Sequence, residues 1–68
     1  MKVVAQQGEM VFIVQIENQL GCVVNTETQE AFKEFNIQSI LMRGYWETPT
    51  ASADVLEQAV ALASKRPQ

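Results

Sequence analysis

Residue types that commonly carry enzyme chemistry are scarce in this chain of 68 residues. It has no histidine, the commonest general base and metal ligand, and its single thiol, Cys22, cannot complete a tetrahedral zinc site. The glycines Gly8, Gly21 and Gly44 are isolated from one another, so the sequence contains no glycine-rich phosphate loop. These absences predict a protein that is not an enzyme and that uses neither a metal nor a cofactor.

Cys22 stands between Gly21 and Val23 in a stretch that is expected to form a strand. No basic residue or helix start is close in sequence, and a reactive thiolate needs such a neighbourhood. Cys22 is therefore interpreted as a small buried apolar residue rather than as a nucleophile. A lone cysteine, together with the absence of an apolar leader, predicts a protein of the reducing cytoplasm.

Three acidic residues, Glu27, Glu30 and Glu34, are spaced to share one face of a helix. A pair of carboxylates can act as acid and base, but only in an environment that perturbs the pKa of one of them. A solvated polar face is the simpler interpretation, because every amphipathic helix has one. A further hypothesis is that these residues make the protein an acidic inhibitor or decoy of a basic partner.

Arg43, Tyr45 and Trp46 form the run of residues best suited to binding. Exposed aromatic rings beside a cation can stack bases and attract phosphates, as in proteins that bind single-stranded nucleic acid. The same residue types dominate protein–protein interfaces. The structural alternative is that Tyr45 and Trp46 point to opposite faces of a strand, so that one covers the core and the other meets solvent. The net charge of −3 disfavours nucleic acid, so a protein interface is the stronger functional hypothesis.

Length and composition indicate one small globular domain that spans residues 1–68. Hydrophobic residues make up 47% of the chain, which argues against disorder. The longest apolar stretch, residues 10–14, is far shorter than the roughly 20 residues of a membrane span, so no membrane association is expected. A chain of this size buries only about 60% of its unfolded surface. Without a disulfide or a metal, self-association is the expected reinforcement.

The first third of the chain predicts three antiparallel strands, at residues 2–6, 10–16 and 20–24. These segments are rich in β-branched and aromatic residues, and turn-prone residues separate them. In the second strand, Val11 and Ile13 point to one face while the alternate apolar residues point to the other. A strand that is apolar on both faces is expected to be covered on both. A second layer, a curled sheet or a partner chain could supply that cover, and we expect a homodimer with Val11 and Ile13 at its interface.

The middle of the chain is predicted to form a helix followed by a strand. Thr26 and Gln29 have the spacing of a capping box, so a helix is expected to begin there and to end near Asn36. The alternative is a strand–turn–strand through residues 26–29. Residues 37–46 then alternate in polarity as in a long strand, which would contain the aromatic run.

The last segment has a regular helical pattern over residues 53–65, with its apolar positions on one face. Ser52 or Thr50 can cap the start of this helix, and Pro67 prevents its continuation. The complete prediction is an α+β fold in β-β-β-α-β-α order, with a small antiparallel sheet and both helices packed on one face. The expected role is that of a small non-enzymatic protein-interaction or accessory module that forms a homodimer. A single-stranded nucleic-acid-binding domain is the alternative.

Overall fold

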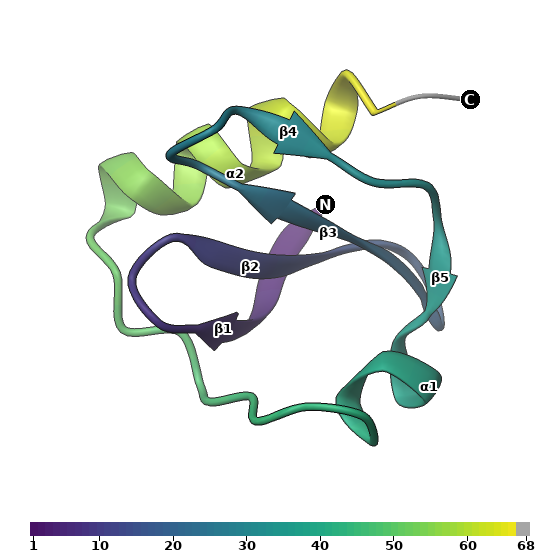
Figure 1. Ribbon diagram of the computed structural model, residues 1–68. Coiled ribbons are helices and arrows are strands. Elements are labelled where there is room, and N and C mark those ends of the chain that lie inside the picture. The colour runs from purple at the N-terminus through teal and green to yellow at the C-terminus, as the bar shows by residue number, and fades with distance from the viewer. Residues whose placement is uncertain (67–68) are drawn as a thin grey trace.

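Five strands are followed by two helices along the chain (Figure 1). The computed structural model describes residues 1–66, so Pro67, the predicted helix stop, lies outside the described residues. The elements are β1 (Lys2–Gln7), β2 (Val11–Glu17), β3 (Leu20–Asn25), β4 (Glu30–Ala31), β5 (Phe35–Asn36), α1 (Ile37–Leu41) and α2 (Ala53–Ser64). This arrangement confirms the predicted α+β class with a small antiparallel sheet, and it places both helices after the last strand.

The three predicted N-terminal strands are confirmed as a meander in the order β1-β2-β3. Gly8 has a φ of +65° in the turn between β1 and β2, a conformation that glycine adopts without steric cost. The short strands β4 and β5 both pair with the outer edge of β3, one near each of its ends. The sheet therefore has two open edges, one at β1 and the other along residues 30–36.

The helix predicted over residues 26–36 is wrong, and the strand–turn–strand alternative describes this segment correctly. The side chain of Asn25 accepts hydrogen bonds from the backbone N–H groups of Glu27 (2.9 Å) and Thr28 (3.2 Å). This local bonding holds the backbone in a turn and competes with helix formation. Gln29 then adopts a φ of 59°, which reverses the chain into β4.

The long strand predicted over residues 37–46 is also wrong, because α1 occupies its first half. Asn36, which was expected to end a helix, begins one instead. Its side-chain oxygen accepts hydrogen bonds from the backbone N–H groups of Gln38 (3.0 Å) and Ser39 (3.3 Å), as an N-cap does. The element order is therefore β-β-β-β-β-α-α, and residues 42–46 follow α1 without regular structure.

The C-terminal helix is confirmed, with Ser52 at its N-cap position. Figure 1 shows α2 behind β3 and β4, where it covers one face of the sheet. The residues of this core with no exposed surface are Phe12, Val14, Cys22, Val24, Ala59 and Ala63. The two alanines let the helix backbone approach the sheet closely, and a side chain such as Phe12 contributes roughly 1.5–3 kcal/mol by its burial.

The opposite face of the sheet, which we call the α1 face, is covered by α1 and the segment after it. Ile13 on this face has no exposed surface. A Cβ atom on Gly21 would lie 2.9 Å from Ile37 Cγ1 and 3.2 Å from Ile13 Cγ2, so the glycine gives α1 room to pack. The two helices thus contact opposite faces of the sheet and not the single face that the sequence predicts.

Gln6 holds the connection between the two helices against β1, a role that the sequence pattern does not reveal. Its backbone N–H and C=O bond to Glu47 at 2.9 and 2.8 Å. Its side chain is 7% exposed, and its oxygen accepts hydrogen bonds from the N–H groups of Thr50 (2.8 Å) and Ala51 (3.3 Å). These bonds fix the approach of the chain to the start of α2.

Candidate interaction surfaces

Arg43, Tyr45 and Trp46 lie in the irregular segment after α1, where Arg43 and Tyr45 are exposed and Trp46 is half-buried. Tyr45 is 72% exposed, and its hydroxyl donates a hydrogen bond to Glu47 Oε1 at 3.0 Å. This bond to a carboxylate raises the pKa of Tyr45 above its ordinary value. A Cβ atom on Gly44 would lie 3.2 Å from the indole nitrogen of Trp46, so the ring folds back over the preceding backbone.

The two aromatic side chains therefore do not form one stacking platform. Tyr45 projects into solvent, whereas Trp46 lies beside β1 because Glu47, the next residue, pairs with Gln6. The Glu47 carboxylate also stands at the tip of the Tyr45 ring. A negative charge at this point repels the phosphates that a bound oligonucleotide would bring.

Large apolar side chains gather on the surface around α1. Of the seven that are exposed within residues 1–66, four fall in residues 35–46, at exposed fractions from 39% to 87%. We call this set, together with Arg43, the α1 surface; its members are Phe35, Leu41, Met42, Arg43 and Tyr45. Exposed large apolar side chains commonly mark a protein-binding site where they lie together on a surface. The sequence prediction did not show this feature, because it placed Phe35 in a helix and the other members in a strand, with Met42 on the face opposite to the rest.

Val11 and Ile13, the residues expected at a homodimer interface, lie on the α1 face. Val11 is half-buried and Ile13 is fully buried by the chain itself. Residues 37–47 thus supply the second layer that this apolar face requires. While the fold is intact, Ile13 has no surface to offer to a partner.

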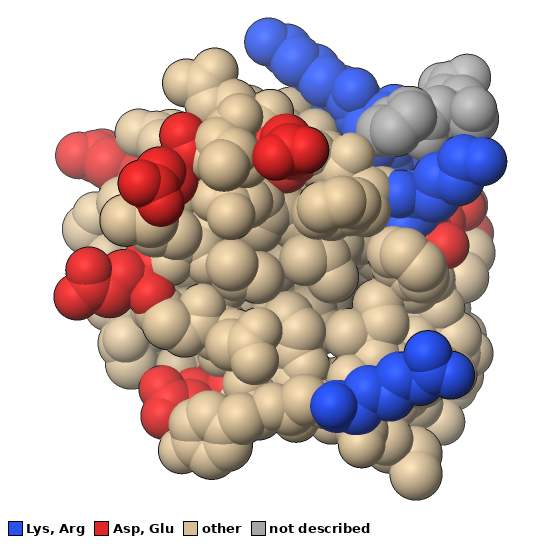
Figure 2. All heavy atoms as spheres, viewed as in Figure 1, with Lys and Arg blue, Asp and Glu red and all other residues tan. Residues whose placement is uncertain are grey.

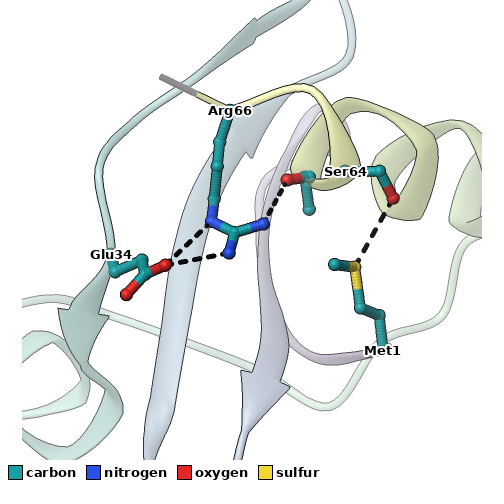
Figure 3. A network of polar contacts seen from close by, with 5 residues as sticks. Met1, Glu34, Ser64 and Arg66 are labelled. Atoms are coloured by element: carbon teal, nitrogen blue, oxygen red, sulfur yellow. Dashed lines mark hydrogen bonds and ion pairs between the residues drawn. The ribbon is translucent and has the colours of Figure 1, made fainter. Parts of the chain in front are cut away.

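The acidic residues Glu27, Glu30 and Glu34 do not share a helix face. They lie in the turn before β4, in β4 and before β5, respectively. Figure 3 shows that Glu34 is paired with Arg66, with 2.8 Å between Oε1 and Nη2. Arg66 also donates to the backbone oxygen of Ala63 at 3.0 Å, so the pair joins the end of α2 to the β4–β5 connection. An exposed ion pair of this type contributes about 0.2–1 kcal/mol.

Cys22 has no exposed surface and no disulfide partner. Burial raises the pKa of its thiol, the cation of Arg66 lowers it to a smaller extent, and Glu34 raises it. A protonated, inaccessible thiol is a poor nucleophile. Among the described residues there is also no group of three or more His, Cys, Asp or Glu side chains placed to hold a metal ion.

A groove of about 380 Å³ runs between β1 and α2. Its lining residues are Lys2, Val3, Leu56, Glu57 and Val60. Three of them are apolar and half-buried, and the two charged side chains have opposite sign. Sequence reasoning missed this groove because it depends on how α2 lies along β1, which no local pattern specifies.

Charged side chains are unevenly distributed over the face seen in Figure 2. Most acidic side chains lie along its left side and most basic ones toward the top and right, where an acidic side chain also lies beside the basic ones. Five Lys and Arg residues in the whole chain are opposed by eight Asp and Glu residues.

The chain matches no protein-family model, and comparisons with curated proteins and with solved structures found no match. Within residues 1–66, no helix is long and apolar enough to cross a membrane.

Proposed function

We propose that the protein is a small non-enzymatic interaction module that acts as a homodimer and binds another protein through the α1 surface. The observation that carries this proposal is the concentration of exposed apolar side chains around α1, with Met42 at 87% and Tyr45 at 72% exposure. Such side chains gain free energy when a partner removes them from water. Arg43 and Tyr45 belong to the residue types that contribute most at protein interfaces.

The homodimer is supported by the small size of the hydrophobic core. Its α2-face core consists of one helix packed on three long strands and one short one, and its only cysteine is unpaired. Small domains of this kind often gain stability by oligomerisation. Two copies would also present two α1 surfaces, and linked binding sites hold a partner more tightly than one site does.

Two other roles have less support from the geometry. Single-stranded nucleic acid would have to stack on Tyr45 alone, beside the Glu47 carboxylate. An acidic decoy would need Glu27, Glu30 and Glu34 on one surface, whereas Glu34 is engaged with Arg66. Oligonucleotide titration tests the first of these two roles directly.

The proposal is tested by comparing proteins captured from an extract of the source cells by three immobilised forms of the protein. These are the wild type, the double variant Met42→Lys/Tyr45→Lys, and the control Met10→Lys. Met10 is also exposed, at 39%, but lies in the β1–β2 turn away from α1. We expect a protein that the wild type and the control retain and that the double variant loses.

A capture profile that does not differ between the wild type and the double variant would contradict binding through the α1 surface. Oligonucleotide titration of Trp46 fluorescence at low salt provides the second arm. Quenching that disappears as salt is added would indicate that the protein binds nucleic acid, and it would contradict the proposal of a protein partner.

A further inference from the structure

The outer edge of β1 carries backbone groups without a strand partner over most of its length. Within residues 1–66, β1 pairs with β2 on one side, and on the other side only Gln6 is bonded, to Glu47. Edge strands with free N–H and C=O groups readily pair with another extended chain. The free stretch ends at Gln6, so a new strand can pair only with the residues before it.

The register of the sheet identifies which backbone groups of β1 face outward. Gln6 faces outward because its N–H and C=O bond to Glu47, and Gln6 is paired with Phe12 on β2. Val14, two residues beyond Phe12, has the same backbone orientation, and it is paired with Val3. The N–H and C=O of Val3 therefore also face outward, away from β2, at the residue before the irregularity that separates Val3 from Ala5 in the β1–β2 register.

The groove between β1 and α2 lies beside this open stretch. Val3 lines the groove together with Leu56 and Val60, so the outward backbone and the apolar groove meet at one residue. An extended strand added here could bond to the Val3 backbone and place an aliphatic side chain in the groove. This combination of an open edge and a neighbouring pocket is typical of β-strand addition.

We propose that this edge and groove bind the β1 strand of a second copy of the chain, so that the two sheets join antiparallel about a two-fold axis at Val3. The inference rests on the proposed homodimer and specifies its interface. Two identical edges can pair in this way because each supplies one outward N–H and one outward C=O at Val3. The axis also keeps both α2 helices on the same face of the joined sheet, which brings the two Val3 side chains together between the two grooves.

Charge favours a second copy as the occupant. Each groove carries one cation and one anion, Lys2 and Glu57. A two-fold axis between the grooves presents Lys2 of each copy to Glu57 of the other. Charge reversal at Glu57 removes two such exposed pairs in each dimer and is therefore expected to weaken the dimer roughly two- to thirtyfold. The double variant Lys2→Glu/Glu57→Lys is expected to restore the wild-type dissociation constant.

Cysteine cross-linking tests this interface. In an antiparallel hydrogen-bonded pair the Cα atoms lie about 5.5 Å apart, within the range of roughly 4.4–6.8 Å that a disulfide spans. We expect Val3→Cys to form a disulfide-linked dimer under mild oxidation. Met42→Cys, at the most exposed of the large apolar side chains, is expected to cross-link much less; the native Cys22 is buried and does not interfere.

Light scattering on the wild type and on Val3→Pro completes the experiment. Proline removes the outward N–H that β1 does not use for pairing with β2, so the fold is retained while the dimer is lost. A dimeric wild type whose Val3→Cys variant does not cross-link would overturn the β1 interface and leave the homodimer standing. A wild type that is monomeric at every concentration would overturn both. A dimeric Val3→Pro variant would also contradict the interface at β1.

Discussion

The two faces of the sheet are covered by different kinds of structure. On one face, α2 packs a regular apolar stripe onto Phe12, Val14, Cys22 and Val24, none of which is exposed. On the α1 face, a short helix and an irregular segment cover Ile13 completely but leave Val11 half-buried. A helix of twelve residues closes a face along its whole length, whereas one of five residues closes it only locally. Stability is therefore expected to concentrate on the α2 face, and exposed apolar side chains on the α1 side.

The largest effect is expected from truncation in the α2-face core. Phe12→Ala should lower the free energy of unfolding by about 3–5 kcal/mol, because it removes buried apolar surface and leaves a cavity. Urea denaturation monitored by circular dichroism measures this loss. A cost below 1 kcal/mol would contradict the assignment of Phe12 to the centre of the core.

A smaller loss is expected on the α1 face from added volume at Gly21. In Gly21→Ala the new Cβ would meet Ile37 Cγ1 and the backbone oxygen of Val14, each at 2.9 Å. Overpacking of this type costs typically about 1–3 kcal/mol. The double variant Gly21→Ala/Ile37→Ala relieves only the side-chain contact and should recover part of the loss. Unchanged urea midpoints for Gly21→Ala would show that α1 does not pack on this residue.

The pH dependence of stability should report on Cys22. Its pKa is raised in the folded protein, chiefly by burial, so the thiol stays protonated after the unfolded chain, with a thiol pKa near 8.5, begins to ionise. The unfolded state then binds fewer protons than the folded state, and the free energy of unfolding falls as the pH rises above about 8.5. The slope has an upper limit of about 1.4 kcal/mol per pH unit.

The control for this pH dependence is Cys22→Ala, which lacks the ionising group. It is expected to be less stable than the wild type at neutral pH. Its free energy of unfolding is expected to fall less steeply above about pH 8.5, the ordinary pKa of a thiol. Equal slopes in the two proteins would contradict a buried, protonated Cys22.

The smallest effect on stability is expected at the α1 surface. Met42→Lys/Tyr45→Lys changes two exposed side chains that make few contacts, so the free energy of unfolding should change by no more than about 0.5 kcal/mol. Thermal unfolding measures this directly. A large loss would show that these side chains support the fold, and it would remove the basis for assigning them to partner binding.

Much of the fold could be predicted from local pattern, and the exceptions have physical causes. The strands β1, β2 and β3 follow from runs of β-branched and aromatic residues between turns, and α2 follows from its helical periodicity. The errors at residues 26–46 arise at Asn25 and Asn36, whose side chains bond to the backbone N–H groups that follow them. One of these bonds stabilises a turn and the other a helix start, and the sequence around an asparagine does not distinguish the two.

The candidate sites were harder to predict because they depend on tertiary placement. Arg43, Tyr45 and Trp46 were identified from residue type alone, but the exposure of Arg43 and Tyr45 follows from the end of α1. The outward backbone of Val3 follows from pairing with β2 and from the Gln6–Glu47 bridge. Glu47 is far from Gln6 in sequence, so no local pattern could have indicated the open edge.

The most direct test of the account is the absolute mass of the wild type and of Val3→Pro, measured by light scattering across a dilution series. One chain has a mass of 7.6 kDa. The account predicts twice this mass for the wild type at the higher concentrations, and the mass of a single chain for Val3→Pro throughout. A wild type that has the mass of a single chain at every concentration would contradict the homodimer on which the proposed function rests.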